Sequence, residues 1–340
     1  MNSKEMYQII ANSIKNQKDV NIEVSINETI YDVCFNSSMP DKGINMPSII
    51  AIPKSKRINN QIILESNNLE TDNLERLLEQ ASETGKSLAR LTSDFPAPII
   101  IPILPSFRSG PYFQQLSREC FELDSNNPNY RIDKQIVRLI NVTKEYLLNK
   151  YGIKAEDKIL LNGYSSSGVF AQRFTFIHPE LVDTACIGGA SGSIPLPSDK
   201  IGYPIGIKDY DQLFGKSFDF KNYSKIKFRY YVGELETSRK SEDRYEEHGN
   251  PAPMHDMSYF DRSVPKEVGK IQRRTLGIEL LSRAEKTVDY LRKNGINILH
   301  TVIPVRHHNN AIGIGVNELG EKYIKDTYLE TLKSHDIESR

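Results

Sequence analysis

The chain has 340 residues, which is enough for one large α/β domain or for two ordinary domains. Its 44 Lys and Arg residues balance its 44 Asp and Glu residues, so zero net charge gives no general attraction to nucleic acid or anionic membranes. The longest apolar runs, such as Pro98–Leu104, are only as long as a β-strand, and no window is long enough for a membrane-spanning helix.

The N-terminal stretch, residues 1–20, has apolar side chains at three- and four-residue spacing and predicts a short helix. It lacks the compact apolar core of a signal peptide, so we expect a cytoplasmic protein, although a chain trimmed of an export signal would leave the same sequence. The cysteines, Cys34, Cys120 and Cys186, are too few and too scattered for a disulfide framework and have no metal-ligand spacing. They predict buried or free thiols.

The first third of the chain predicts the leading strands of a sheet. Asn21–Phe35 alternates apolar and polar residues, as a half-buried strand or hairpin does. Further strands are predicted at Ser48–Ile52 and Gln61–Leu64, followed by a helix within Leu69–Leu91. Pro98–Leu104 is almost continuously apolar, which is typical of a strand that is covered on both faces.

Strands and helices then alternate to the end of the chain. The predicted elements are a helix at Asp133–Tyr151 capped by Gly152, a strand ending near Leu161, a helix at Val169–His178, strands at Leu181–Gly188 and Lys227–Gly233, one helix at Lys266–Asn294 and a last strand at Ile296–Pro304. We find no repeat and no composition break, which favours a single domain over 1–340. Segments 192–222 and 238–263 are predicted to be lids or inserts.

A serine-rich turn lies between the strand ending near Leu161 and the helix that follows. Its sequence, Gly163-Tyr-Ser-Ser-Ser-Gly168, is close to the G-x-S-x-G nucleophile elbow, in which small residues allow a strained turn that exposes the serine hydroxyl. Ser165 has Gly163 two residues before it and Ser167 two residues after it, so we predict that Ser165 is the nucleophile. Ser166 and Ser167 are the alternatives, and helix capping is the structural explanation for all three serines.

A serine nucleophile needs a base within hydrogen-bond reach and an acid that orients the base. Glu236 follows the strand Lys227–Gly233, and His308 follows the last strand, which gives the order serine, acid, histidine. Because reactive groups gather at the carboxyl ends of parallel strands, these loops are expected to converge. Glu234 and Asp243 are alternative acids, and His307 is an alternative base. No third ligand is spaced with the His pair, so we predict neither a metal nor another cofactor.

The run Val142–Gly189, which contains this turn and His178-Pro179, resembles bacterial serine hydrolases related to poly(3-hydroxybutyrate) depolymerases and feruloyl esterases. Tyr203–Asp209 and Gly233–Thr237 are also similar, and the likeness extends over roughly 95–310. The resemblance implies the α/β-hydrolase fold, a mostly parallel central sheet flanked by helices, with insertions near the active site. It also implies esterase activity without fixing the substrate. Relatives usually have Asp where this chain has Glu236, and their loop pattern sets the base on His308.

The remaining site residues are predicted from their position. The N–H of Ser166 and one from Ser106 or Phe107, in the turn-rich loop Pro105–Pro111, would form the oxyanion hole. An ordinary loop is the alternative for these last two residues.

Tyr164, Tyr203 and Tyr210 would contact an apolar or sugar-linked acyl group. The predicted function is hydrolysis of a small-molecule or oligomeric carboxylic ester through an acyl-enzyme on Ser165. A peptidase, an acyltransferase or an inactive binding protein of the same fold are the alternatives. The sequence does not predict the oligomeric state.

Overall fold

The computed structural model describes residues 19–26, 28–55, 57–68, 73–105, 110–190, 194–234, 236, 263–277 and 279–304. The described part divides into two compact units, one formed by 19–114 and 123–161 and the other by 115–122 and 162–304. Predictions that concern residues 1–18, Ser106, Phe107, Asp243, most of 238–263 and the histidines His307 and His308 lie outside the described residues. The prediction of a single domain stays a prediction.

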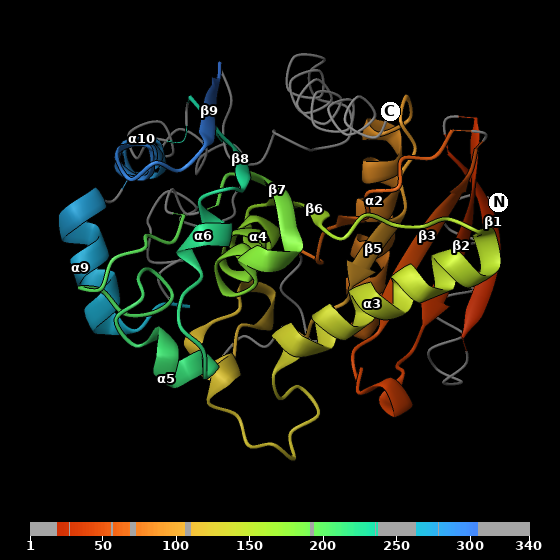
Figure 1. Ribbon diagram of the computed structural model, residues 1–340, viewed down its shortest axis with the longest axis horizontal. Helices are drawn as coiled ribbons and strands as arrows, with labels where there is room; N and C mark the ends of the chain where they lie inside the picture. The colour runs from red at the N-terminus through yellow and green to blue at the C-terminus, as the bar shows by residue number, and fades with distance from the viewer. Residues whose placement is uncertain are drawn as a thin grey trace, which may run out of the picture. The chain divides into compact units, whose positions relative to one another are not determined.

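The strands β1 to β5 of the N-terminal part of the chain lie in the first unit (Figure 1). In order across its sheet the strands are β1 (Val20–Ile26), β2 (Thr29–Asn36), β3 (Ser48–Lys54), β5 (Ile99–Pro102), β4 (Ile63–Leu64) and β6 (Ile159–Tyr164), the last of which passes into the second unit at Asn162. The predicted alternating segment is a hairpin, in which Ile26 pairs with Thr29. The pairs β1–β2, β2–β3 and β3–β5 are antiparallel, whereas β4 runs parallel to both of its neighbours, β5 and β6.

Helices α2 (Leu74–Leu91) and α3 (Ile132–Tyr151) cover opposite faces of this sheet. Successive strand residues point to opposite faces. Val33 on β2 lines a cavity against α2, and the sulfur of the next residue, Cys34, lies 3.5 Å from the hydroxyl of Tyr146 on α3. Helix α3 ends at Gly152, whose left-handed conformation (φ 67°) confirms the predicted C-cap.

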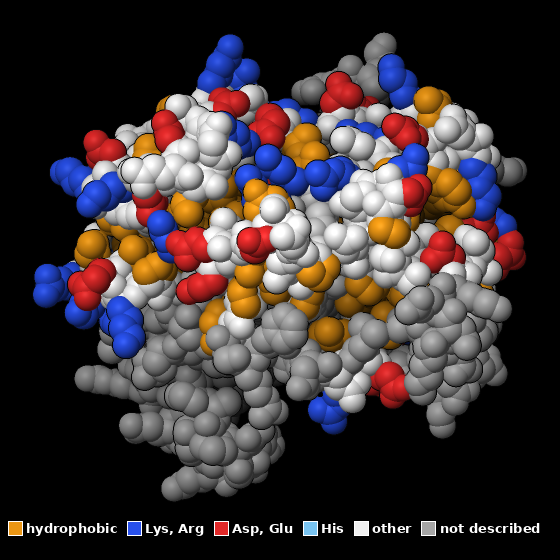
Figure 2. Space-filling view, turned by 90° about the horizontal axis from the view of Figure 1, so that it is seen from below, with side chains coloured by type: hydrophobic (Ala, Val, Ile, Leu, Met, Phe, Trp, Pro, Cys, Tyr) orange, Lys and Arg blue, Asp and Glu red, His pale blue; other side chains and the backbone are white. Residues whose placement is uncertain are grey.

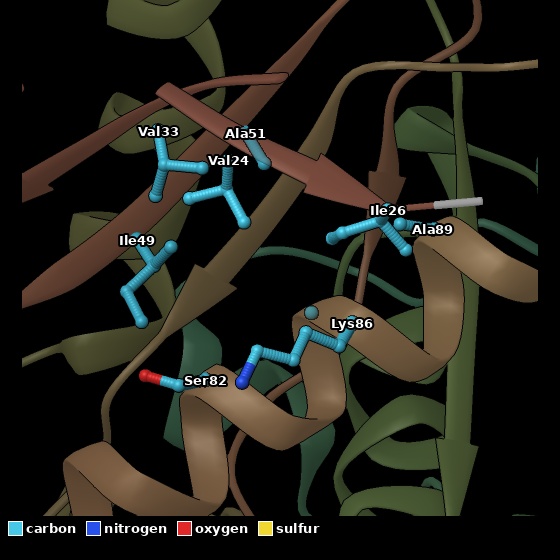
Figure 3. Close-up of a pocket in the computed structure, with 9 residues that line it drawn as sticks. Val24, Ile26, Val33, Ile49, Ala51, Ser82, Lys86 and Ala89 are labelled. Carbon is cyan, nitrogen blue, oxygen red and sulfur yellow. The ribbon is translucent and has the colours of Figure 1, made fainter. Parts of the chain in front are cut away.

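The cavity between α2 and the sheet is small and apolar (Figure 3). Its volume of about 20 Å³ is close to the space for a single water molecule. Val24, Ile26, Val33, Ile49, Ala51, Ser82, Gly85, Lys86 and Ala89 line it. The Ser82 hydroxyl is already donated to the carbonyl of Leu78 at 2.8 Å, so this polar group is satisfied by its own helix. The cavity is therefore a packing gap in the core of the first unit.

The second unit contains three parallel strands, β7 (Val182–Gly188), β8 (Lys227–Gly233) and β9 (Ile298–Ile303), which lie side by side in that order. All three occur where the sequence predicts them. In the register, Gly188 pairs with Tyr231, and Gly233 pairs with Ile303. Because the strands are parallel and aligned, their carboxyl ends lie at one edge of the sheet.

The longer helices of this unit pack on these strands. Helix α4 (Ser166–Ile177) contacts β7, and α10 (Leu280–Lys293) contacts β8 and β9. The prediction of one helix over Lys266–Asn294 is wrong, because α9 (Lys266–Leu276) ends before α10 begins. Gly277 has φ 94° and ψ −170°, a conformation outside the helical region that glycine adopts without a steric penalty.

The described part of the predicted lid, 194–222, contributes to the core of the second unit. It contains two short helices, α5 (Tyr210–Phe214) and α6 (Phe220–Tyr223). Aromatic rings from these helices pack mostly edge-to-face with Phe176 of α4 and with the neighbouring rings of Tyr203 and Phe218. The prediction that 192–222 covers the active site stays a prediction.

Acidic and basic side chains are interspersed on the face of the molecule that Figure 2 shows. This distribution agrees with the zero net charge of the chain. Among the helices that the structure describes, none has the length and apolar character needed to cross a membrane.

Candidate active site

Ser165 occupies the turn between β6 and α4, and its backbone is strained. It has φ 57° and ψ −119°, a combination that residues with a side chain rarely adopt. Its amide donates to the carbonyl of Gly188 at the end of β7, at 2.9 Å, and its own carbonyl accepts from Val169 to begin the helix. Ser165 is partly exposed, whereas Ser166 and Ser167 are buried. A strained, partly exposed serine between a strand and a helix is what the predicted nucleophile elbow requires.

The turn is possible only because two neighbours lack side chains. A Cβ on Gly163 would lie 2.2 Å from the carbonyl oxygen of Ser167. A Cβ on Gly168 would lie 2.8 Å from the Cβ of Ala190, on the segment that follows β7. The close approach between α4 and the end of β7 therefore requires glycine at 168, one position later than the usual motif.

Ser167 stabilises the turn from within. Its Oγ accepts from the amide of Tyr164 and donates to the carbonyl of Tyr164, both at 2.9 Å. Ser167 is fully buried. The serine that replaces the last glycine of G-x-S-x-G thus has a structural role, because its hydroxyl hydrogen-bonds the end of β6 to the first turn of α4.

Ser166 is the first residue of α4 and follows the candidate nucleophile directly. Its backbone N–H belongs to the first turn of a helix, where amides have no partner within the helix. The position suits an oxyanion donor, because the helix dipole also favours negative charge there. The other predicted donors, Ser106 and Phe107, lie outside the described residues.

Glu236 is fixed immediately beyond β8. Its carboxylate Oε1 accepts from the amide of Gly233 at 2.8 Å, and its own amide donates to the carbonyl of Gly233 at 3.1 Å. The side chain is buried, with 1% of the residue exposed. Glu234, the alternative acid, is exposed. Of the two, Glu236 has the fixed and buried carboxylate that an orienting acid needs.

The strand that precedes the predicted base ends beside Glu234. β9 ends at Ile303, whose carbonyl accepts from the amide of Glu234 at 2.9 Å. The chain therefore leaves the sheet at the same edge as the turn that contains Glu236. His307 and His308 follow within a few residues and lie outside the described part of the chain.

The three predicted substrate-binding tyrosines are all buried. Tyr203 and Tyr210 are at most 1% exposed, and their hydroxyls donate to backbone carbonyls of Leu116 and of Phe176 and Ile177, respectively. Their burial does not support a substrate contact and gives both rings a packing role. Tyr164, 8% exposed, stacks on Tyr231 with ring centroids 6.0 Å apart, next to the elbow.

Other reactive residue types have structural roles. His178 is buried at the end of α4, packs with its ring tilted against Phe174 and has Nδ1 3.3 Å from the carboxylate of Glu180. The three cysteines are free and buried, as predicted. Burial raises the pKa of the Cys120 thiol to about 12, so it is protonated at neutral pH. Among the described residues, no cluster of His, Cys, Asp and Glu could hold a metal ion.

Sequence reasoning missed one residue beside the elbow. The side-chain amide of Gln115 donates to Oγ of Ser166 at 3.2 Å, and its backbone carbonyl accepts from Arg173 of α4 at 2.7 Å. Gln115 is 2% exposed. It lies in a short segment, 115–122, far in sequence from α4, and no local pattern signals the contact.

Comparison with known proteins identifies the fold. No protein-family model matches the sequence, and neither does any curated protein. Poly(aspartic acid) hydrolase-1 from Sphingomonas sp. KT-1 is similar in structure, with a TM-score of 0.51 over 91% of this chain and 97% of that chain, at 14% identity. The chain has the α/β-hydrolase fold, as predicted.

Two further solved structures are similar to this chain at lower TM-scores. One is an S-formylglutathione hydrolase from Agrobacterium tumefaciens, with 11% identity, a TM-score of 0.48 and coverage of 92% of this chain and 98% of that chain. The other is a ferulic acid esterase, with 11% identity, a TM-score of 0.43 and coverage of 93% and 96%.

Proposed function

We propose that this chain is a serine hydrolase that cleaves a carboxylic ester through an acyl-enzyme on Ser165. The observation that carries the proposal is the strained backbone of Ser165, φ 57° and ψ −119°, at a partly exposed turn between β6 and α4. A capping serine needs no such strain, because N-cap residues normally have extended backbone. A strained backbone conformation persists only where the surrounding structure holds it, and such residues cluster at functional sites.

In the proposed reaction, Oγ of Ser165 attacks the ester carbonyl while His308 takes the hydroxyl proton. The N–H of Ser166 and a second amide, from Ser106 or Phe107, stabilise the oxyanion. The imidazolium then gives its proton to the departing alcohol, which leaves the acyl group on Ser165. Water attacks the acyl-enzyme as His308 takes a proton from it, and the imidazolium returns that proton to Oγ of Ser165 as the carboxylic acid is released.

Glu236 is the proposed acid that orients His308. Its buried carboxylate at the end of β8, next to the point where β9 ends, supports this role. The acid stabilises the imidazolium and does not itself take the proton. Tyr164 is the proposed substrate contact, since it lies directly before the nucleophile and, at 8% exposed, is the least buried of the three predicted tyrosines. The substrate class is a small-molecule or oligomeric ester.

Hydrolysis of p-nitrophenyl acetate and butyrate tests the function. We expect turnover that is abolished in His308→Ala and retained in His307→Ala. Loss of turnover in His307→Ala alone would move the base to His307. Cleavage of peptidyl p-nitroanilides but not of esters would identify a peptidase, and transfer to an added alcohol without hydrolysis would identify an acyltransferase. A folded protein that turns over none of these substrates contradicts the proposal.

A further inference from the structure

We infer that Gln115 is a positioning residue for the oxyanion hole, acting through the Ser166 side chain. The inference rests on the proposed function, because it assigns a role to the amide that follows the nucleophile. It concerns a residue on a segment that the elbow motif does not include.

The contacts of Gln115 are concentrated on α4. Its Nε2 lies 3.2 Å from Oγ of Ser166, and its backbone oxygen lies 2.7 Å from Nη1 of Arg173. Ser166 and Arg173 are about two helical turns apart and therefore share one face of α4. Gln115 is thus connected to the first turn of the helix by its side chain and to the second by its backbone.

The segment that contains Gln115 is itself held in place. Residues 115–122 belong to the second unit, whereas the residues on either side of them belong to the first. The carbonyl of Leu116 accepts from the hydroxyl of Tyr203, and Arg118 forms an ion pair with Asp209. Phe121 packs edge-to-face on Tyr203, with ring centroids 5.5 Å apart. The 194–222 segment therefore fixes 115–122 beside α4.

Two strained residues flank this hydrogen bond. Leu116, next to Gln115, has φ 45°, and Ser165, next to Ser166, has φ 57°. Both values are rare for residues with a side chain. Leu116 is fully buried, so its conformation is not that of a free surface turn. Strained backbone on both sides of one contact, fully buried at Leu116 and partly exposed at Ser165, indicates that the contact is maintained at an energetic cost, as happens at functional sites.

The polar character of Gln115 also needs an explanation. Its Oε1 is buried and has no hydrogen-bond partner in the described structure. Burying such an atom is unfavourable, and a Met side chain of similar size would fill the space without this penalty. The one favourable side-chain interaction that the described structure gives Gln115 is the bond to Ser166. The presence of a glutamine at this buried position is therefore explained by its hydrogen bond to Ser166.

The bond matters because of the N–H of Ser166. Oxyanion donors work when they already point at the developing charge, and a misplaced donor loses much of its effect. A hydrogen bond from Gln115 to Oγ holds the side chain of Ser166, while its place as the first residue of α4 holds its backbone. Substrate binding precedes the charge development, so a positioning role affects kcat more than KM.

The test is a double-mutant cycle with Gln115→Met, Ser166→Ala and the double variant. Steady-state hydrolysis of p-nitrophenyl butyrate gives kcat and KM, and a short-chain aliphatic trifluoromethyl ketone, which forms a tetrahedral oxyanion on the serine, gives an inhibition constant. We expect each single variant to lower kcat about tenfold with KM within about twofold, and the inhibition constant to rise by a similar factor. In the double variant we expect the same loss of kcat, about tenfold, because the two substitutions remove the same hydrogen bond.

Gln61→Met is the matched control, since Gln61 is a buried glutamine of the first unit whose side-chain atoms make no hydrogen bond. It should leave kcat and the inhibition constant unchanged. If Gln115→Met fails to fold, Ser166→Ala still tests the contact. A kcat within twofold of wild type in Ser166→Ala or Gln115→Met, or a multiplicative loss in the double variant, overturns the inference. An inert wild-type enzyme would instead contradict the proposed function.

Discussion

The hydroxyl of Ser167 lies 2.9 Å from both the amide nitrogen and the carbonyl oxygen of Tyr164. The two hydrogen bonds engage this hydroxyl inside the turn, at full burial. Of the three consecutive serines, Ser167 therefore stabilises the elbow, Ser166 bonds to Gln115, and Ser165 lies at the strained and partly exposed position.

Ser167→Ala is expected to destabilise the protein without removing its nucleophile. The substitution leaves the buried amide of Tyr164 without its side-chain acceptor, which costs about 1–3 kcal/mol. Urea unfolding measures this loss, and hydrolysis of p-nitrophenyl butyrate should stay within about tenfold of wild type. Unchanged stability together with lost hydrolysis would instead identify Ser167 as the nucleophile.

Glu236→Gln is expected to reduce kcat by about a hundredfold or more, because a neutral amide does not stabilise the imidazolium. The amide oxygen still accepts from Gly233, so the thermal unfolding midpoint should change little. The assay is ester hydrolysis at neutral pH with an unfolding scan on the same samples.

Glu234→Gln is the matched control for Glu236→Gln, since it changes an exposed carboxylate at the end of the same strand. It should retain full activity. The assignment of the acid is contradicted if Glu236→Gln is as active as wild type, and it moves to Glu234 if only the control loses activity.

Asp32 should make the stability of the first unit depend on acid pH. Partial burial raises the pKa of its carboxyl, but hydrogen bonds from Lys54 and Tyr151 lower it more, so the net pKa lies below the ordinary value. Lys54 Nζ lies 2.9 Å from Oδ1, and the Tyr151 hydroxyl lies 2.7 Å from Oδ2. Because the folded-state pKa is lowered, the stabilisation is present above the unfolded pKa of about 4 and is lost as pH falls through the folded pKa.

Chemical denaturation between pH 7 and pH 3 measures this dependence. The stability difference between wild type and Asp32→Asn should be constant down to about pH 4 and should shrink below it. Tyr151→Phe removes one donor to Asp32 and should give a smaller difference with the same pH profile. A difference that grows as the pH falls is the opposite sign and would rule out this role for Asp32.

The sequence predicts the local elements well where periodicity and end signals agree. β8 has the predicted bounds Lys227–Gly233, and α3 ends at the predicted Gly152. The turn at Ser165 is predictable because its glycines, its serines and its flanking strand and helix are adjacent in the chain. Its one departure from the motif, Ser167, has a hydrogen-bonding role that only the folded turn reveals.

The sequence was less informative where distant segments meet. The sequence does not reveal that Tyr203 and Tyr210 form part of the core, where large rings are the most effective side chains for burying apolar surface. The helical spacing of apolar residues continues across Gly277, so the sequence pattern does not indicate that α9 ends there and that α10 is a separate helix. The contact of Gln115 with Ser166 joins residues far apart in sequence and requires the structure.

Covalent labelling with a fluorophosphonate, followed by peptide mapping, tests the central assignment most directly. We expect one adduct on the wild-type protein, on Ser165, that disappears in Ser165→Ala and persists in Ser167→Ala. The contradicting result is a folded wild-type protein that takes no label, or an adduct that maps to another serine and survives Ser165→Ala.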